Sequence, residues 1–235
     1  MAFSLFISDL HLDSKSRLEI NNFIKFCNNP NTQKADNLFI LGDFFESYLG
    51  DDISLAYYAE VITLLKKLAK KVPTFIIKGN RDFLLANDFE KASGVKIIPE
   101  PYLLNLYNKK YLLMHGDSLC TDDVEYQQFR KNIRDENNIK EYFKKSKTER
   151  ITIAKNLREN SKKTNKNKPY EIMDVNKKTV AELMSKYPNT TLIHGHTHRQ
   201  NIHNNINYQR IVLGDWHKDK ISVLTITNSN DISFN

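Results

Sequence analysis

The 235-residue chain has little of what marks a secreted, membrane-spanning or multidomain protein. Its two cysteines, Cys27 and Cys120, lie far apart and outside any Cys-x-x-Cys spacing, so we expect neither a disulfide framework nor a zinc knuckle. A run of about 18 apolar residues occurs nowhere, and no basic stretch followed by a long apolar run opens the chain, so we expect no membrane span and no signal peptide. Since no Pro- or Gly-rich linker divides the sequence, it predicts a single domain over residues 1–235 in a reduced, cytoplasmic setting.

The positive charge is concentrated in one segment. The formal net charge is +7, and between Lys140 and Lys168 the chain has eleven Lys and Arg against three acidic residues. The net positive charge of this segment alone therefore exceeds that of the whole chain, and the rest of the chain is close to neutral. A solvated helix face explains such a segment as well as a binding surface does.

Short apolar runs that end in Asp or Gly predict buried strands over residues 3–8, 37–41 and 74–78. The segments between them, 16–27 and 54–71, carry apolar residues at helical spacing, so the order of elements favours a parallel sheet covered by helices. Further strands are predicted over residues 102–106, 110–115, 191–194, 209–213 and 221–227. Residues 122–188 show a helical pattern instead, and we interpret them as a helical cap inserted into the domain.

Five short polar runs follow predicted strands. They are Ser8-Asp9-Leu10-His11, Gly42-Asp43, Gly79-Asn80-Arg81-Asp82, His115-Gly116-Asp117 and His194-Gly195-His196-Thr197-His198. Because the carboxyl ends of parallel strands open onto one crevice, we expect the carboxylates of Asp9 and Asp43 to meet there. Side chains two residues apart point the same way in an extended or tightly turned segment. Asp9 and His11 could therefore coordinate one metal ion together, and so could His196 and His198.

Imidazole nitrogens mixed with carboxylate oxygens suit Mn²⁺, Fe²⁺ or Zn²⁺ better than Ca²⁺, and Mn²⁺ is our preference. Taken singly, an Asp-x-His run is most often a helix cap or a surface turn, and Gly-Asp is usually a turn. Five such runs, each at a strand exit, are hard to explain by folding alone. The conjunction predicts a dinuclear metal site.

The order of these runs resembles the calcineurin-like metallophosphoesterases, whose sequences carry D-x-H, G-D, G-N-H-D/E, H and G-H-x-H. The resemblance implies an α/β fold, a sandwich of two mixed β-sheets flanked by helices, here with the cap insertion. It also implies two metal-ligand sets that share Asp43 as the bridge. These are Asp9, His11, Asp43 and His198 for one metal, and Asp43, Asn80, His115 and His196 for the other.

One position departs from most of that superfamily, because Arg81 stands where the usual run has a His that protonates the leaving group. A guanidinium is not deprotonated at any working pH, so it cannot supply that proton. A phosphoanhydride releases a phosphate that is already a stable anion, and Arg can bind such a group bidentately. Arg81 therefore favours a diphosphate substrate.

Longer stretches resemble one family within the superfamily, the UDP-2,3-diacylglucosamine diphosphatases of bacterial lipid A synthesis. They include the runs 113–123, 126–130, 172–175, 193–199 and 212–217. The resemblance implies hydrolysis of UDP-2,3-diacylglucosamine to UMP and 2,3-diacylglucosamine 1-phosphate by attack at the α-phosphorus, with two Mn²⁺ per chain and Fe²⁺, Zn²⁺ or Mg²⁺ less expected. It further implies catalytic roles for Asn80, Arg81 and His196, and substrate contacts from Asn80, Arg81, Asp123, Ser161, Asn165, Lys168 and His196.

The cap has features suited to a substrate with two acyl chains. Aromatic and aliphatic residues such as Tyr142, Phe143, Ile151 and Leu157 alternate with lysines, so the cap could offer an apolar groove beside a charged one. Such a surface would also attract anionic lipid head groups, which predicts peripheral association with the cytoplasmic face of the bacterial inner membrane. These apolar residues could instead serve only to attach the cap to the sheet.

Two other functions stay open. A dinuclear nuclease or cyclic-nucleotide phosphodiesterase could use the basic cap to bind phosphates, although Arg81 argues against it. A non-catalytic module that recognises RNA is the third interpretation. Our prediction is an enzyme that binds no nucleic acid and needs no obligate protein partner. We also expect Asp82, Asp117 and His194 to help orient the ligating imidazoles.

Overall fold

The computed structural model describes residues 1–166, 168–169, 171–217 and 220–235. The chain forms two compact units, one of residues Met1–Gly116 and Met184–Asn235, and one of Asp117–Leu183. The second unit overlaps the segment 122–188 that was predicted as an inserted cap, and its regular elements are helices. Among the described residues, no helix has the length and apolar character needed to cross a membrane.

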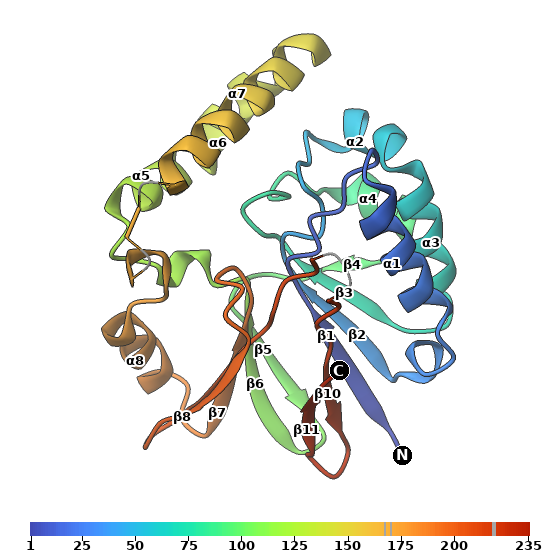
Figure 1. The fold of residues 1–235 in the computed structure, drawn as a ribbon, viewed down its shortest axis with the longest axis vertical. Helices are drawn as coiled ribbons and strands as arrows, with labels where there is room; N and C mark the ends of the chain where they lie inside the picture. Colours follow the sequence, from blue (N-terminus) through green and yellow to red (C-terminus); the bar gives the residue numbers. More distant parts are fainter. Residues whose placement is uncertain (167, 170, 218–219) are drawn as a thin grey trace. The chain divides into compact units, whose positions relative to one another are not determined.

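The first unit contains a six-stranded sheet in the order β11-β10-β1-β2-β3-β4 (Figure 1). Strands β1 to β4 pair in parallel, and β10 pairs antiparallel with both β1 and β11. The strands are β1 (Phe3–Ile7), β2 (Asn37–Leu41), β3 (Thr74–Ile77), β4 (Lys96–Ile97), β10 (Leu224–Thr227) and β11 (Ile232–Phe234). The sheet is therefore mixed, as the family resemblance implied, and not wholly parallel.

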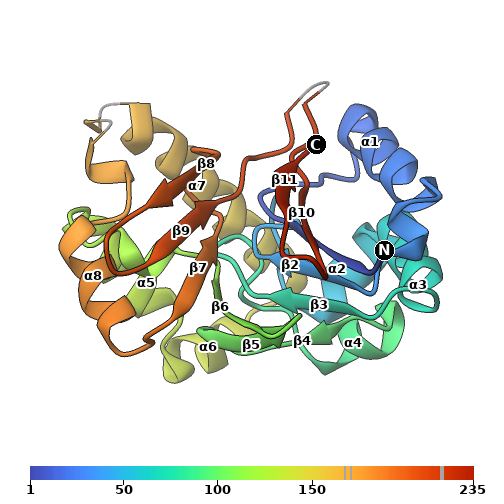
Figure 2. The same cartoon turned by 90° about the horizontal axis from the view of Figure 1, so that it is seen from below.

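A second sheet in the same unit has the order β5-β6-β7-β9-β8 and is also mixed (Figure 2). Its central strands β6, β7 and β9 run parallel, and β5 and β8 pair antiparallel at the two edges. The strands are β5 (Tyr102–Leu106), β6 (Lys109–Met114), β7 (Thr190–His194), β8 (Asn201–Asn204) and β9 (Gln209–Val212).

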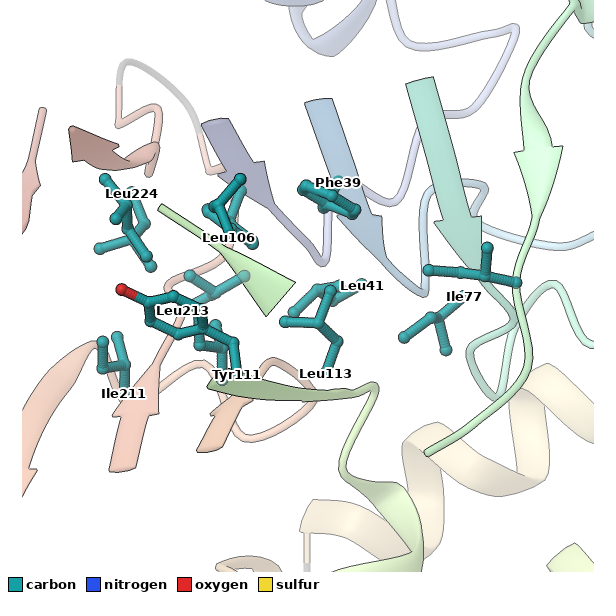
Figure 3. Close-up of a cluster of buried hydrophobic side chains, with 13 residues drawn as sticks. Phe39, Leu41, Ile77, Leu106, Tyr111, Leu113, Ile211, Leu213 and Leu224 are labelled. Atoms are coloured by element: carbon teal, nitrogen blue, oxygen red, sulfur yellow. The ribbon is translucent and has the colours of Figure 1, made fainter. Parts of the chain in front are cut away.

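The two sheets enclose an apolar core. Figure 3 shows Phe39, Leu41 and Ile77 of the first sheet in one cluster with Tyr111, Leu113 and Ile211 of the second. Leu38 and Ile40, which alternate with Phe39 and Leu41 along β2, are buried as well, on the opposite face of that strand. A strand buried on both faces needs an almost continuous apolar run, which explains why residues 37–41 were recognisable in the sequence.

Helices of the first unit lie on the outer side of the first sheet (Figure 1). They are α1 (Arg17–Asn28), α2 (Asp51–Tyr57), α3 (Ala59–Ala69) and α4 (Asn87–Ser93), with a 3₁₀ turn at Thr32–Lys34. The segment 54–71, which has apolar residues at helical spacing, is helical but is divided between α2 and α3, because the helical path breaks at Tyr58. This residue has a φ of −104° and a ψ of 25°, and its hydroxyl donates to the carbonyl of Ser47.

The second unit consists of helices and short turns. It contains η2 (Asp117–Leu119), α5 (Val124–Ile133), α6 (Glu136–Phe143), α7 (Lys147–Lys166), η3 (Glu171–Met173) and most of α8 (Lys177–Ser185). Asp123 and Asp135 cap the first turns of α5 and α6, because their carboxylates accept hydrogen bonds from backbone N–H groups there. The basic residues of the sequence segment 140–168 lie mostly on α7.

Candidate metal centre

The loops that follow four strands are joined by backbone hydrogen bonds. The amide of Asp9 donates to the carbonyl of Gly42 over 3.1 Å, and the amide of His11 donates to the carbonyl of Asp43 over 3.0 Å. On the second sheet, the amide of Gly195 donates to the carbonyl of His115 over 2.9 Å. The exits of β1 and β2, and those of β6 and β7, therefore meet as the sequence predicted.

One group of possible ligands consists of Asp9, His11 and His198, whose donor atoms lie within 4.8 Å of one another. Nε2 of His198 is 3.3 Å from Oδ1 of Asp9 and 3.4 Å from Nε2 of His11. The two imidazole nitrogens face each other closely, with a carboxylate oxygen beside them. A cation at this point would have two nitrogen ligands and one oxygen ligand.

A second group consists of Asp9, Asp43 and His115, also within 4.8 Å. Nε2 of His115 lies 3.5 Å from Oδ1 of Asp43. Oδ1 of Asn80 lies 2.9 Å from both Nε2 of His115 and Nδ1 of His196, which extends this group to two further predicted ligands. Asp9 belongs to both groups, whereas the resemblance implied Asp43 as the bridge, and that assignment stays a prediction.

The structure thus brings all seven predicted metal ligands into two neighbouring groups. It does not support the argument that His196 and His198 grip one ion together. His196 faces Asn80, and His198 faces Asp9 and His11. The two side chains diverge because both residues have left-handed backbone, with φ of 65° and 59°, so the run is not an extended segment.

Left-handed backbone conformations are concentrated at this site. Among the described residues, nine that are not glycine have a positive φ, and five of these nine are predicted metal ligands. They are Asp9, His11, Asp43, His196 and His198, with φ between 48° and 65°. Such conformations cost of order 1–3 kcal/mol each and persist only where the surroundings enforce them, and they gather at functional sites.

Two glycines let the backbone approach the carboxylates. A Cβ on Gly79 would lie 2.2 Å from both N and Oδ1 of Asp43, and one on Gly195 would lie 2.4 Å from Oδ2 of Asp9. Any side chain at these positions would displace a possible ligand. This close packing explains why glycine occupies these positions in the Gly-Asn and His-Gly-His runs.

The carboxylates of this site carry a large desolvation cost. Burial raises the pKa of the Asp43 carboxyl to about 7, with the neighbouring Asp82 and Asp9 adding to the rise and His115 opposing it. Burial also acts to raise the pKa of Asp9, but the attraction of nearby imidazoles, that of His198 above all, outweighs it and lowers that pKa. Buried carboxylates in such proximity need a positive charge among them.

The histidines respond to these carboxylates in opposite ways. Burial lowers the pKa of His11 to about 3, so its imidazole is neutral near pH 7, as a metal ligand must be. Burial opposes the charged form of His198 too, but the carboxylates of Asp215 and Asp9 raise its pKa to about 10.

The residues fit a divalent cation. Within the part of the chain that the structure describes, Oδ1 of Asp9, which faces the imidazoles of the first group, is among the buried atoms without a hydrogen-bond partner. Such atoms are costly unless they bind something, and the available donors are carboxylate oxygen, amide oxygen and imidazole nitrogen. This donor set suits a divalent metal ion.

A sequence profile described as Calcineurin-like phosphoesterase matches residues 4–200. The chain belongs to the calcineurin-like phosphoesterase family. This family implies divalent metal binding, and the predicted superfamily and metal-dependent hydrolase class are confirmed. The expected sandwich of two mixed sheets is confirmed as well.

Curated relatives of this phosphoesterase match over almost their whole length. A protein of Haemophilus ducreyi named UDP-2,3-diacylglucosamine hydrolase is 42% identical over 94% of both chains. One of the same name from Shewanella baltica is 45% identical over 95% of this chain and 93% of its own. The predicted resemblance to that family is confirmed. An archaeal phosphodiesterase of known structure shares the fold, with a TM-score of 0.52 and 12% identity over 99% of this chain and 98% of its own.

Arg81 lies beside the carboxylates of the phosphoesterase site. Its backbone amide donates to Oδ1 of Asp43 over 2.8 Å, and its Nε is 3.8 Å from Oδ2 of the same residue. Its Nη1 is 3.7 Å from Oε1 of Glu46, and the side chain is 22% exposed. A guanidinium in this position can reach both the acidic cluster and the solvent.

Two acidic residues next to the ligands were missed in the sequence. Oε2 of Glu46 lies 3.7 Å from Nδ1 of His11, and Oδ2 of Asp215 lies 3.5 Å from Nδ1 of His198. Gly42-Asp43 follows β2 directly and Gly214-Asp215 follows β9 after one residue, and this repeated Gly-Asp signal could have identified Asp215. Glu46 gave no such signal, because only the fold of its loop brings it to His11.

Two of the three residues expected to orient the imidazoles, Asp82 and Asp117, have partners of another kind. The Asp82 carboxylate accepts from the amides of Gly79 over 2.7 Å and Phe44 over 2.8 Å, so it shapes the loops around Asp43. The Asp117 carboxylate accepts from Tyr126 and Arg130 within the second unit. None of these four partners is an imidazole. Nδ1 of His115 is instead held by the carbonyl of Leu41 over 2.9 Å.

The remaining predicted substrate contacts belong to the second unit. Asp123 and Lys168 form an ion pair of 2.6 Å, and Ser161 is half-buried on α7. The side chain of Asn165 lies outside the described residues. Contact of these four residues with a substrate stays a prediction.

Proposed function

We propose that the chain hydrolyses the diphosphate of UDP-2,3-diacylglucosamine, with water attacking the α-phosphorus to give UMP and 2,3-diacylglucosamine 1-phosphate. Relatives that are 42% and 45% identical over nearly the whole chain are named as hydrolases of that compound, which supports this substrate. The observation that carries the proposal is Arg81, held at the acidic cluster where a proton donor would otherwise stand. An arginine there suits a leaving group that needs charge stabilisation and no proton.

We further propose that the two groups of ligands hold two Mn²⁺ ions, with Fe²⁺, Zn²⁺ and Mg²⁺ less suited. Asp9, His11, Asp43 and His198 would hold one ion, and Asp43, Asn80, His115 and His196 the other. Such ions, when bound, lower the pKa of water towards neutrality and neutralise phosphate charge. The two carboxylates leave this pair of ions with a net positive charge for the diphosphate.

The side chains of this chain then bind and orient the substrate. Arg81 would contact the anionic oxygens of the departing sugar phosphate, and its partly exposed guanidinium beside Asp43 supports this role. Asn80 and His196 contact the phosphate that is attacked. Asp43 fixes the Arg81 backbone through the 2.8 Å bond to its amide, so it links the ligand set to the substrate-binding group.

In this proposal the second unit binds the rest of the substrate. Asp123, Ser161, Asn165 and Lys168 contact its polar part, and the apolar residues of α6 and α7 contact the acyl chains. Phe143, Ile151 and Leu157 are exposed, by 44%, 49% and 42%, which leaves them available for such contacts. The many lysines of α7 support peripheral binding to the cytoplasmic face of the inner membrane.

The chemical test follows the oxygen of water into the product. Reaction in H₂¹⁸O with Mn²⁺ should release UMP that carries one ¹⁸O, because attack at the α-phosphorus places the new oxygen there. Label in the sugar phosphate would disprove the proposed site of attack. Bis-p-nitrophenyl phosphate and single-stranded DNA, offered in parallel, should react far more slowly, and faster cleavage of DNA would favour the nuclease alternative.

Variants connect this activity to the proposed site. Asp43→Ala and Asn80→Ala should each abolish UMP release, whereas Asp88→Ala, which removes an exposed acid of α4, should leave it unchanged.

Membrane binding is tested by sedimentation with vesicles. The protein should sediment with vesicles that contain anionic lipids at low salt and dissociate from them at high salt. Equal recovery in the supernatant at both salt concentrations would contradict peripheral binding.

A further inference from the structure

His194, the last residue of β7, is fully buried between two polar partners. Its Nδ1 lies 2.9 Å from the carbonyl oxygen of Gly195, and its Nε2 lies 3.1 Å from Nη1 of Arg210. A guanidinium can only donate hydrogen bonds, so Nε2 must accept. The ring proton is therefore on Nδ1, which donates to the carbonyl of Gly195.

That carbonyl closes a strained turn. It also accepts from the amide of Thr197 over 2.8 Å, which is the bond of a three-residue γ-turn centred on His196. The φ of His196 is 65°, and γ-turns with a positive central φ are rare and strained. Such a turn persists only where neighbouring groups hold it. The amide of His196 is itself held by Oδ2 of Asp9, over 2.9 Å.

The neighbouring residues leave room for the His194 ring and for its partner. A Cβ on Gly116 would lie 2.9 Å from Nδ1 of His194, so a glycine there permits the ring to occupy this position. Arg210 is on β9, next to β7 in the sheet, where it pairs with Leu192, two residues before His194. The guanidinium thus comes from a rigid strand, which fixes the direction from which it donates.

We propose that His194 and Arg210 form a positioning pair that holds the γ-turn of His196. Arg210 selects the tautomer of His194, His194 holds the carbonyl of Gly195, and the turn directs the imidazole of His196 towards Asn80. This inference rests on the proposed function, in which His196 binds a cation and the substrate. Neither His194 nor Arg210 touches the substrate in this account.

Two variants of His194 separate positioning from simple packing. In His194→Asn the amide nitrogen can take the place of Nδ1 and still donate to Gly195. In His194→Gln the amide lies near the former Nε2, by Arg210, and the bond to Gly195 is lost. We expect kcat to fall by roughly 10- to 100-fold in His194→Gln and by less than about 5-fold in His194→Asn, with KM nearly unchanged in both.

Arg210→Met should lower kcat by about 10-fold, because the tautomer of His194 is then no longer fixed by a donor at Nε2. Equal losses of kcat in His194→Asn and His194→Gln, or losses that follow the Tm of each variant, would overturn the positioning role. Mn²⁺ affinity, measured by titration, should follow the same order as kcat.

A spectroscopic measurement needs no turnover. Long-range ¹H–¹⁵N spectra of the wild-type protein, with His194 assigned by its loss in His194→Gln, should show a protonated Nδ1 and an unprotonated Nε2. The reverse tautomer would overturn the proposal. The kinetic assays are repeated with bis-p-nitrophenyl phosphate. If UDP-2,3-diacylglucosamine is not cleaved but the tautomer and the order of variants hold on that substrate, the proposed function fails and the positioning pair stands.

Discussion

The backbone amide of His196 donates a hydrogen bond to Oδ2 of Asp9 over 2.9 Å, although 187 positions separate the two residues. This bond ties the exit of the first sheet to the exit of the second. It uses one oxygen of the Asp9 carboxylate, and the other oxygen is the buried atom that lacks a hydrogen-bond partner. One carboxylate therefore fixes the backbone of the site and offers a ligand to a cation.

Asp9→Asn separates these two roles. The amide oxygen of Asn can still accept from His196, so the fold should persist, but the negative charge and one possible ligand oxygen are lost. We expect kcat to fall by about 1,000-fold, equivalent to about 4 kcal/mol, and Mn²⁺ binding to weaken. Calorimetric titration with Mn²⁺ checks this, with the exposed Asp88→Asn as the matched control. Unchanged affinity and stoichiometry in Asp9→Asn would contradict the assignment.

Replacement of Arg81 should change the choice of substrate. Arg81→His restores a proton donor of the kind that esters need and removes the bidentate cation that suits a diphosphate. The ratio of kcat/KM for bis-p-nitrophenyl phosphate to that for UDP-2,3-diacylglucosamine should rise by roughly 10- to 100-fold. Arg81→Lys, which keeps the charge, should lower both activities with little change of the ratio. If both variants alter the ratio equally, Arg81 does not distinguish anhydrides from esters.

The strands that carry the ligands were predictable because they are buried on both faces. Residues 37–41 form a continuous apolar run that ends at Gly42-Asp43, and the rule that parallel strand ends share a crevice then places Asp43 with Asp9. Strands β8 and β11 gave no such signal. They are short edge strands with half-buried or exposed residues, so neither their composition nor their length distinguishes them from loops.

The details of the site were less predictable, because they depend on backbone conformation. The divergence of His196 and His198 follows from the left-handed backbone of both residues, which lie on either side of Thr197 and which no spacing rule anticipates. The position of Glu46 beside His11 and Arg81 depends on the path of the loop after Asp43. Residue types at strand exits thus identified the ligands, and only the fold showed how they divide into groups.

Removal of metal should destabilise the first unit. Asp9 and Asp43 are buried close together, so their charges repel unless a cation lies between them. A cation that binds only the folded state stabilises that state, and the stabilisation grows with the logarithm of the metal concentration divided by Kd. Free Mn²⁺ at about 100 times its Kd contributes about 2.7 kcal/mol. Addition of EDTA should therefore lower the Tm by several degrees, and excess Mn²⁺ should restore both the Tm and the activity. A chelated sample that melts unchanged and stays fully active would contradict a metal centre.

Alkaline pH should weaken the fold through Cys27. Burial raises the pKa of its thiol from 9.0 to about 12, so the folded state holds the proton more tightly than the unfolded chain does. This contribution to the free energy of unfolding is fully present below pH 9 and is lost as the pH rises towards 12, by roughly 1 kcal/mol per pH unit. Urea unfolding between pH 7 and pH 10.5 should give a steeper decline for the wild type than for Cys27→Ala. Tyrosines that titrate in this range are common to both proteins, so the difference isolates the thiol, and parallel curves would refute its contribution.

Asp51 should stabilise the first unit without a part in catalysis. Its Oδ2 accepts from the amides of Asp88 over 2.9 Å and Phe89 over 3.0 Å, and its Oδ1 accepts from the hydroxyl of Tyr48 over 2.8 Å. The N-cap residue of α4 is Ala86, which has no side chain for this purpose, so a residue of α2 caps α4 in its place. Asp51→Ala should lower the free energy of unfolding by about 2 kcal/mol and leave kcat unchanged, as measured by urea denaturation and UMP release. Asp52→Ala, its exposed neighbour in the first turn of α2, should cost less than about 0.5 kcal/mol. Equal costs in the two variants would show that the charge near the start of α2 matters and the cap of α4 does not.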